Sequence, residues 1–281
     1  MIYLLFAIAS SAIVSVCMRI SERYVRNTMA MFTANYAICL ALSLLYMGNI
    51  RIFAYENGMG TAIGLGLANG LIYLVCFILL QQSIRYNGIV LSSASMKLGA
   101  VLIPVFAAIL LFNEHMEWPQ FWGAVFAVLA ILLINIEKED IHHGSKKTWL
   151  IILLAVNGLT DTMANIYDKT GAQALKNHYL FYTFLTALLL AFMMALWKRD
   201  RIRGADIYYG LLIGIPNYYS ARFLLSALRN VPAVIVYPAY SVGTIITITL
   251  VGLAVFHEKL SGKKMAALVL IIISLIMLNI S

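Results

Sequence analysis

The sequence has very little charge for its length. Only 11% of its 281 residues are Asp, Glu, Lys or Arg, whereas soluble domains have about 25%. Cysteine is also scarce, and Cys17, Cys39 and Cys76 lie within apolar runs without CxxC or Cys/His spacing. The low charge argues against a soluble domain, and the cysteine pattern gives no basis for a disulfide framework or a cysteine-held metal.

Long apolar runs take up most of the chain, which is 62% hydrophobic. The first run begins almost at Met1 without a basic n-region or a small-residue cleavage site, so we interpret it as a retained membrane span. Each of ten runs has about the 20 residues that a helix needs to cross a bilayer. They cover residues 2–20, 29–47, 61–82, 89–112, 119–136, 149–167, 178–197, 206–228, 232–256 and 263–280. The runs are too long and too uniformly apolar for barrel strands. We therefore predict an all-α integral membrane protein with ten transmembrane helices.

The two halves of the chain resemble each other. "LFNEHMEWPQFWGAVFAVLAILLIN" at 111–135 aligns without a gap on "VFHEKLSGKKMAALVLIIISLIMLN" at 255–279. The same offset places Gly66 on Gly210. We predict a five-helix repeat over 1–137, a charged linker over 138–148 and a second five-helix repeat over 149–281. An odd number of spans per repeat inverts the second half, which is the plan of many secondary transporters.

These features resemble a known family. A ten-span chain of this length, in which each half ends in Phe-x-Glu (112–114 and 256–258), a short turn and a last apolar span, resembles the EamA-type transporters of the drug/metabolite transporter superfamily. The resemblance covers the whole chain. It implies transport, with a leaning toward efflux of amino acids or related metabolites, and leaves the substrate itself open.

The segment "MRISERYVR" at 18–26 also resembles the first span end of the small multidrug resistance proteins, which are half-length relatives. Those proteins use a membrane glutamate near the middle of that span for protons and cationic drugs. Ser11 stands at the matching position here, and about Asn157 in the second half. This departure argues against proton-coupled cation export of that type.

The orientation has two opposing indications. Most lysines and arginines fall in loops on the side reached after the first span, so the positive-inside rule predicts that both termini lie outside. The family resemblance implies that both lie inside. Because the basic residues are scattered over many short loops, nucleic-acid binding is not expected.

Three charged residues lie deep within predicted spans. Lys97 is ~13 Å and Asp161 ~18 Å from the loop side at which their spans begin, at 1.5 Å per residue, and Arg222 is deep in the eighth span. Charges at such depth usually face a cavity or a partner. Lys97 could bind an anionic group of a substrate, pair with Asp161 as a structural or gating ion pair, or snorkel toward the loops.

Amides and tyrosines inside the spans complete the candidate site, because such groups hydrogen-bond polar solutes or bridge helices. The predicted substrate-binding residues are Lys97, Asp161, Arg222, Asn35, Tyr73, Asn157, Tyr218 and Tyr240. Proline at 104, 216 and 238 predicts bends or hinges within three spans.

Nothing in the sequence indicates an enzyme. Glu114 and Glu258 are predicted at opposite membrane faces and cannot act as a catalytic pair, and the His142-His143 pair lies in the charged linker. No catalytic residue, metal or cofactor is expected, and proton coupling is left as an option. We predict a secondary active transporter of a bacterial cytoplasmic membrane that moves a small polar metabolite by alternating access. A flippase for a lipid-linked group and a multidrug or cation exporter are the alternatives, and the protein is expected as a monomer or a homodimer.

Overall fold

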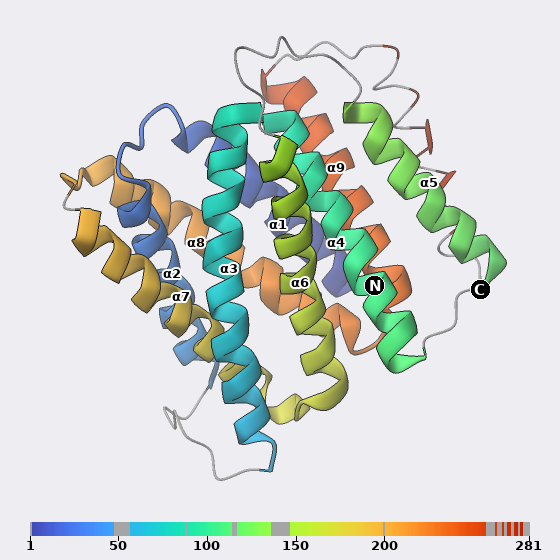
Figure 1. The fold of residues 1–281 in the computed structure, drawn as a ribbon, viewed down its shortest axis with the longest axis horizontal. Coiled ribbons are helices and arrows are strands. Elements are labelled where there is room, and N and C mark those ends of the chain that lie inside the picture. Colours follow the sequence, from blue (N-terminus) through green and yellow to red (C-terminus); the bar gives the residue numbers. More distant parts are fainter. Residues whose placement is uncertain are drawn as a thin grey trace.

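The computed structural model is a bundle of helices (Figure 1). It describes residues 2–47, 57–87, 89–113, 117–135, 147–198 and 200–256, together with scattered positions between 262 and 277. In these residues nine α-helices and one short 3-10 helix are present, and no strand. They are α1 (Ile2–Ser21), α2 (Thr28–Met47), α3 (Met59–Asn87), α4 (Ile89–Phe112), α5 (Trp118–Asn135), α6 (Lys147–Thr170), η1 (Gln173–Leu175), α7 (Lys176–Lys198), α8 (Gly204–Leu228) and α9 (Ala233–Phe256).

The helix bounds follow the predicted spans closely. Each of the first nine apolar runs corresponds to one helix, so the all-α prediction is confirmed in the described part of the chain. Among the described residues, six helices are long and apolar enough to cross a membrane. The tenth predicted span, 263–280, and the turns with Glu114 and Glu258 lie largely or wholly outside the described residues. Ten spans therefore remain a prediction.

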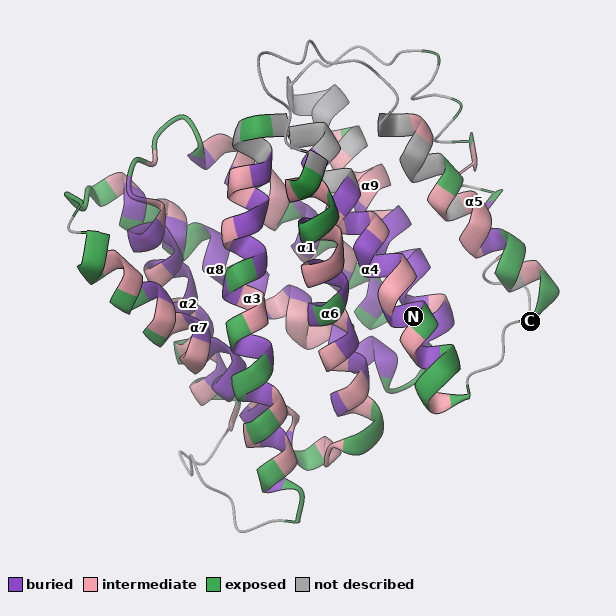
Figure 2. Cartoon of the chain, in the orientation of Figure 1, coloured by how far each residue is buried: buried purple, intermediate pink, exposed green. Residues whose placement is uncertain are grey.

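The surface of the bundle carries large apolar side chains. Leu45 and Leu110 are each 75% exposed, and Trp197 is 86% exposed. Figure 2 shows exposed and partly exposed positions along the outward faces of the helices, while the buried positions face the bundle interior. A soluble monomer rarely exposes apolar surface on this scale, whereas lipid tails cover it without cost.

Glycines set the closest helix contacts. A side chain on Gly66 or Gly70 of α3 would overlap Thr183 and its neighbours in α7, and one on Gly210 or Gly214 of α8 would overlap the backbone of α2. These glycines are the ones that the sequence offset aligns. Small residues let helix backbones approach this closely. By contrast, Gly60 and Gly64 face open space, so the first glycine pair of α3 does not serve the same contact.

The helices of one half pack mainly on helices of the other half. Helix α1 contacts α8, as α6 contacts α3; α2 contacts α8, as α7 contacts α3; and α4 contacts α6, as α9 contacts α1. Adding five to the number of a first-half helix, and subtracting five from that of a second-half helix, converts one contact of each pair into the other. The interior between the halves is therefore built from reciprocal contacts, with α5 at one edge (Figure 1).

A buried carboxylate that the sequence reasoning did not select fixes one end of the bundle. Asp206 in the first turn of α8 is fully buried and accepts hydrogen bonds from the backbone N–H groups of Arg26, Asn27 and Arg203. It caps the start of α8 and at the same time holds the α1–α2 connection.

Candidate functional site

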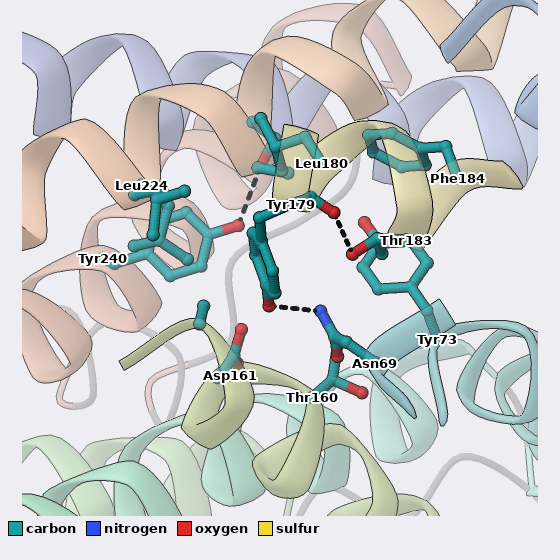
Figure 3. A pocket seen from close by; sticks show the side chains of 14 residues that line it. Asn69, Tyr73, Thr160, Asp161, Tyr179, Leu180, Thr183, Phe184, Leu224 and Tyr240 are labelled. Carbon is teal, nitrogen blue, oxygen red and sulfur yellow. Dashed lines mark hydrogen bonds between the residues drawn. The ribbon is translucent and has the colours of Figure 1, made fainter. Parts of the chain in front are cut away.

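A cavity of about 60 Å³ lies between α3, α6, α7, α8 and α9. That volume accommodates several water molecules, at roughly 10–15 Å³ for each. Figure 3 shows polar and aromatic side chains from these helices turned toward one another around it. The lining residues are Asn69, Tyr73, Thr160, Asp161, Ala164, Tyr179, Leu180, Thr183, Phe184, Ser220, Ala221, Leu224, Leu225 and Tyr240.

Asp161 places a carboxylate in the cavity wall. It lies within the span Thr148–Thr170 of α6. Its Oδ2 accepts a long hydrogen bond of 3.4 Å from the Asn157 amide, and the Tyr237 hydroxyl donates to its backbone carbonyl. The Tyr237 bond fastens α9 to α6 without occupying the carboxylate, so most of the acceptor capacity of Asp161 is left for a ligand.

Asn69 supplies a second acceptor. Its amide nitrogen donates to the Tyr179 hydroxyl at 2.8 Å (Figure 3). Its Oδ1 is buried and has no hydrogen-bond partner among the described residues. The Tyr179 ring is held in place by stacking on Tyr167, with ring centres 4.2 Å apart. Because an unsatisfied buried acceptor costs free energy, the Asn69 oxygen is a point at which a ligand donor would be stabilising.

Lys97 is buried beside the cavity but does not line it. Its side chain is 7% exposed. The ammonium donates to the Ser11 hydroxyl at 3.3 Å and lies 4.5 Å from the centre of the Tyr240 ring. Among the described residues it forms no ion pair with Asp161, and its burial does not fit snorkelling toward the loops. Tyr240 is the shared element, since it contacts Lys97 and lines the same cavity as Asp161.

Tyr73 joins the cavity to a polar chain in the bundle interior. Its hydroxyl donates to Asn217 Oδ1 at 2.7 Å, and Asn217 donates to Asn35 Oδ1 at 3.2 Å. Asn35 is buried, and its Nδ2 has no hydrogen-bond partner in the part of the chain that the structure describes. This chain links α3, α8 and α2, so Asn35 contributes to the packing behind the cavity and not to its wall.

Asn157 serves a similar bridging role on α6. Its amide nitrogen donates to the backbone carbonyl of Met96 at 3.0 Å as well as to Asp161, and its Oδ1 accepts from the Cys76 thiol. It therefore positions Asp161 relative to the segment of α4 that precedes Lys97.

Arg222 and Tyr218 lie on another face of α8. Arg222 Nη1 donates to Asn177 Oδ1 at 2.7 Å and to the Tyr218 hydroxyl at 3.1 Å, and its guanidinium lies 3.9 Å from the centre of the Tyr46 ring. Neither Arg222 nor Tyr218 lines the cavity. Of the predicted residues, the structure thus places Asp161, Tyr73 and Tyr240 in its wall.

The cavity wall also contains residues that are not among the predicted substrate-binding residues. Ser220 shares a 3.0 Å hydrogen bond with the Tyr240 hydroxyl, and the Thr183 hydroxyl donates to the backbone carbonyl of Tyr179. Thr160 directly precedes Asp161, and Asn69 lies one helical turn before Tyr73. The available signal for Thr160 is its position beside Asp161, and for Asn69 it is an amide group within an apolar span. In the described residues no group of three or more His, Cys, Asp or Glu side chains could hold a metal ion.

Residues 147–280 match the EamA-like transporter family. This match covers just under half of the chain and places residues 147–280 in the drug/metabolite transporter superfamily. The resemblance expected from the Phe-x-Glu repeats is thereby confirmed. Members of the EamA family are transporters and not enzymes, which agrees with an apolar bundle whose helices can span a membrane several times.

Two further comparisons cover nearly the whole chain. An uncharacterized protein of Haemophilus influenzae is 23% identical over 266 residues. The alignment covers 92% of this chain and 90% of the relative. A protein of known crystal structure superimposes with a TM-score of 0.72 at 12% identity, over 99% of this chain and 95% of the other. The structural likeness extends to the first half of the chain, although at this identity it concerns the fold alone.

Proposed function

We propose that the protein is a secondary active transporter. It moves a small polar metabolite, an amino acid or a similar compound, across the cytoplasmic membrane by alternating access to the cavity around Asp161. The observation that carries this proposal is a carboxylate in the wall of a cavity within the membrane-spanning part of the bundle. A charge in that position is costly and typically marks a substrate or ion pathway.

The reciprocal helix contacts support alternating access. The cavity is lined by α3 from the first half and by α6, α7, α8 and α9 from the second. Related helices of two inverted repeats can exchange their packing with little change in energy, because each contact has a counterpart of the same kind. The aligned glycines of α3 and α8 supply such counterparts.

The chemistry of the wall favours a substrate with N–H donors. The Asp161 carboxylate and the Asn69 Oδ1 oxygen both have unused acceptor capacity. A protonated amine has three donors on one nitrogen and could satisfy both acceptors. The amino end of an amino acid fits this requirement, and its carboxylate could then reach Lys97 when the Tyr240 ring turns away.

A cation or multidrug exporter is the second candidate. It is favoured by the placement of Lys97 outside the cavity wall, where its charge is shielded by the Tyr240 ring. In that arrangement the cavity presents a carboxylate without a facing ammonium. The small volume of the cavity gives no support to a lipid-linked substrate.

Proton coupling would use Asp161, because a carboxylate can bind either a proton or a substrate amine. In such an exchange mechanism the two ligands compete for one site, and the protonated carboxyl releases the amine. The proposal requires no cofactor, and a monomer already contains both halves.

The experiment is a ligand screen by thermal unfolding of the purified protein. Zwitterionic, anionic and cationic metabolites are compared on the wild type and on Lys97→Met. A specific ligand at 100 times its dissociation constant stabilises by about 2.7 kcal/mol. Stabilisation by zwitterions that the substitution removes supports the metabolite transporter. Stabilisation by cations that survives the substitution supports the exporter, and no stabilisation by any of the three classes contradicts both.

A further inference from the structure

Arg222 is held in a fixed position by neutral groups. Asn177 Oδ1 and the Tyr218 hydroxyl accept from its Nη1, and the Tyr46 ring lies against the face of its guanidinium. The Asn177 amide in turn donates to the backbone carbonyl of Tyr46 at 2.7 Å. Helices α2, α7 and α8 thus orient one edge of the guanidinium while its Nε and Nη2 donors take no part in these bonds.

Lys176 brings a second cation to the same place. Its ammonium donates to the Ser226 hydroxyl at 2.9 Å, and Ser226 lies one turn beyond Arg222 and donates to the Arg222 carbonyl. Lys176 precedes Asn177, which holds Arg222. One hydrogen bond uses one of the three donors of an ammonium, so Lys176 also has donors to spare.

Neither cation forms an ion pair with a carboxylate in the described part of the chain. Asp168 attracts the Lys176 ammonium, but Arg222 and Arg229 repel it more strongly. Asp168, the carboxylate near the end of α6, accepts a hydrogen bond from Gln173 at 3.1 Å. Both Arg222 and Lys176 are half-buried, so solvent screens their mutual repulsion only in part. Two like charges held together in this way destabilise the site unless an anion binds between them.

The pair lies next to the cavity. Lys176 is three and four residues before Tyr179 and Leu180 on α7, and Arg222 directly follows Ala221 on α8. Tyr179, Leu180 and Ala221 all line the cavity. An anion at Arg222 and Lys176 would therefore lie one helical turn from the cavity, toward the end of the bundle where α7 begins.

We propose that Arg222 and Lys176 form a separate anion-binding site that accepts a carboxylate or phosphate group. The planar guanidinium offers two parallel N–H donors to such a group, and the ammonium supplies a point charge. The anion comes either from a solute in water or from the headgroup of an acidic lipid. The site goes beyond the proposed transport cycle, since it exists whether or not the cavity moves a metabolite.

The test is the thermal stability of the full-length protein in two settings. In a neutral detergent, inorganic phosphate is titrated at constant ionic strength. In nanodiscs, phosphatidylcholine alone is compared with a mixture that contains phosphatidylglycerol. Arg222→Gln and Lys176→Gln are measured beside the wild type, and Lys169→Gln is the control, because it removes an exposed lysine near the end of α6.

A stabilisation by phosphate, with an apparent dissociation constant at least about tenfold higher in both variants and unchanged in the control, identifies a site for soluble anions. A stabilisation by phosphatidylglycerol alone, lost in the same two variants, identifies the lipid headgroup. No stabilisation in either setting, or the same response in all four proteins, overturns the proposal. Should Arg222→Gln fail to fold, Lys176→Gln decides the result, because Lys176 does not take part in the Tyr46, Asn177 and Tyr218 contacts. Neither readout depends on transport.

Discussion

The ammonium of Lys97 lies 4.5 Å from the centre of the Tyr240 ring, and the Tyr240 ring lines the cavity that contains Asp161. The Tyr240 side chain thus lies between the buried Lys97 ammonium and the cavity that contains the Asp161 carboxylate. The face of the ring attracts the cation, while the hydroxyl reaches Ser220 in the cavity wall. Rotation of this single side chain would connect Lys97 to the cavity.

Replacement of Lys97 by Met is expected to leave the protein as stable as the wild type or more stable. Lys97 forms no ion pair among the described residues, so its loss breaks no direct contact between charged groups, and Met has a similar shape. Transport of the identified substrate is expected to fall at least about tenfold, the value of a lost charge-assisted contact. Thermal unfolding and uptake into proteoliposomes measure the two effects. Wild-type uptake by Lys97→Met would exclude a role for the ammonium.

Replacement of Asp161 by Asn is expected to remove the response of transport to a pH gradient. The Asn amide has nearly the same shape as the Asp carboxylate, but it cannot bind and release a proton at neutral pH. Uptake with and without an imposed gradient measures the effect, and Asp168→Asn near the end of the same helix is the control. A gradient response that persists in Asp161→Asn would place proton coupling elsewhere.

Gly99→Ala is expected to lower the free energy of unfolding by about 1–3 kcal/mol. A methyl group at this position would overlap the Leu154 carbonyl in α6, so α4 and α6 would have to separate. Gly64→Ala is the matched control, because its methyl group would meet open space. It is expected to stabilise α3 by roughly 0.5–1 kcal/mol. Equal effects of the two substitutions in an unfolding titration would contradict the packing described here.

Asp206→Ala is expected to destabilise the protein by at least about 2 kcal/mol, because three backbone N–H groups lose a charged acceptor. The exposed Asp200, in the connection between α7 and α8, is the control. Its backbone carbonyl, and not its side chain, accepts the hydrogen bond from Asn27. Asp200→Ala should therefore change the unfolding temperature little. A similar loss in both variants would show that Asp206 acts through charge alone.

The helix bounds could be predicted from the sequence because a bilayer demands about 20 consecutive apolar residues for each span. Asp161, Tyr73 and Tyr240 could be selected for a related reason: polar groups stand out within apolar runs. Thr183 and Ser220 could not, because hydroxyl groups are common in membrane helices and often bond their own backbone.

The apolar pattern does not determine how each helix is rotated about its own axis, and therefore which side chains face the cavity. Ala221 faces the cavity and Arg222, the next residue, does not, yet both lie at the same predicted depth. Asp206 shows a second limit, since its partners Arg26 and Asn27 are far away in the chain. Such contacts depend on how the two halves dock, which the apolar pattern of either half leaves open.

The most direct measurement is the accessibility of the cavity from each side of the membrane. Ala221→Cys is introduced into a protein whose three native cysteines, all buried, are replaced by Ala. A membrane-impermeant thiol reagent is then applied to right-side-out and to inside-out vesicles. Ala187→Cys on α7, at a fully buried position outside the cavity wall, is the unreactive control. Alternating access predicts that Cys at position 221 is labelled from both sides, whereas labelling from one side alone would contradict it.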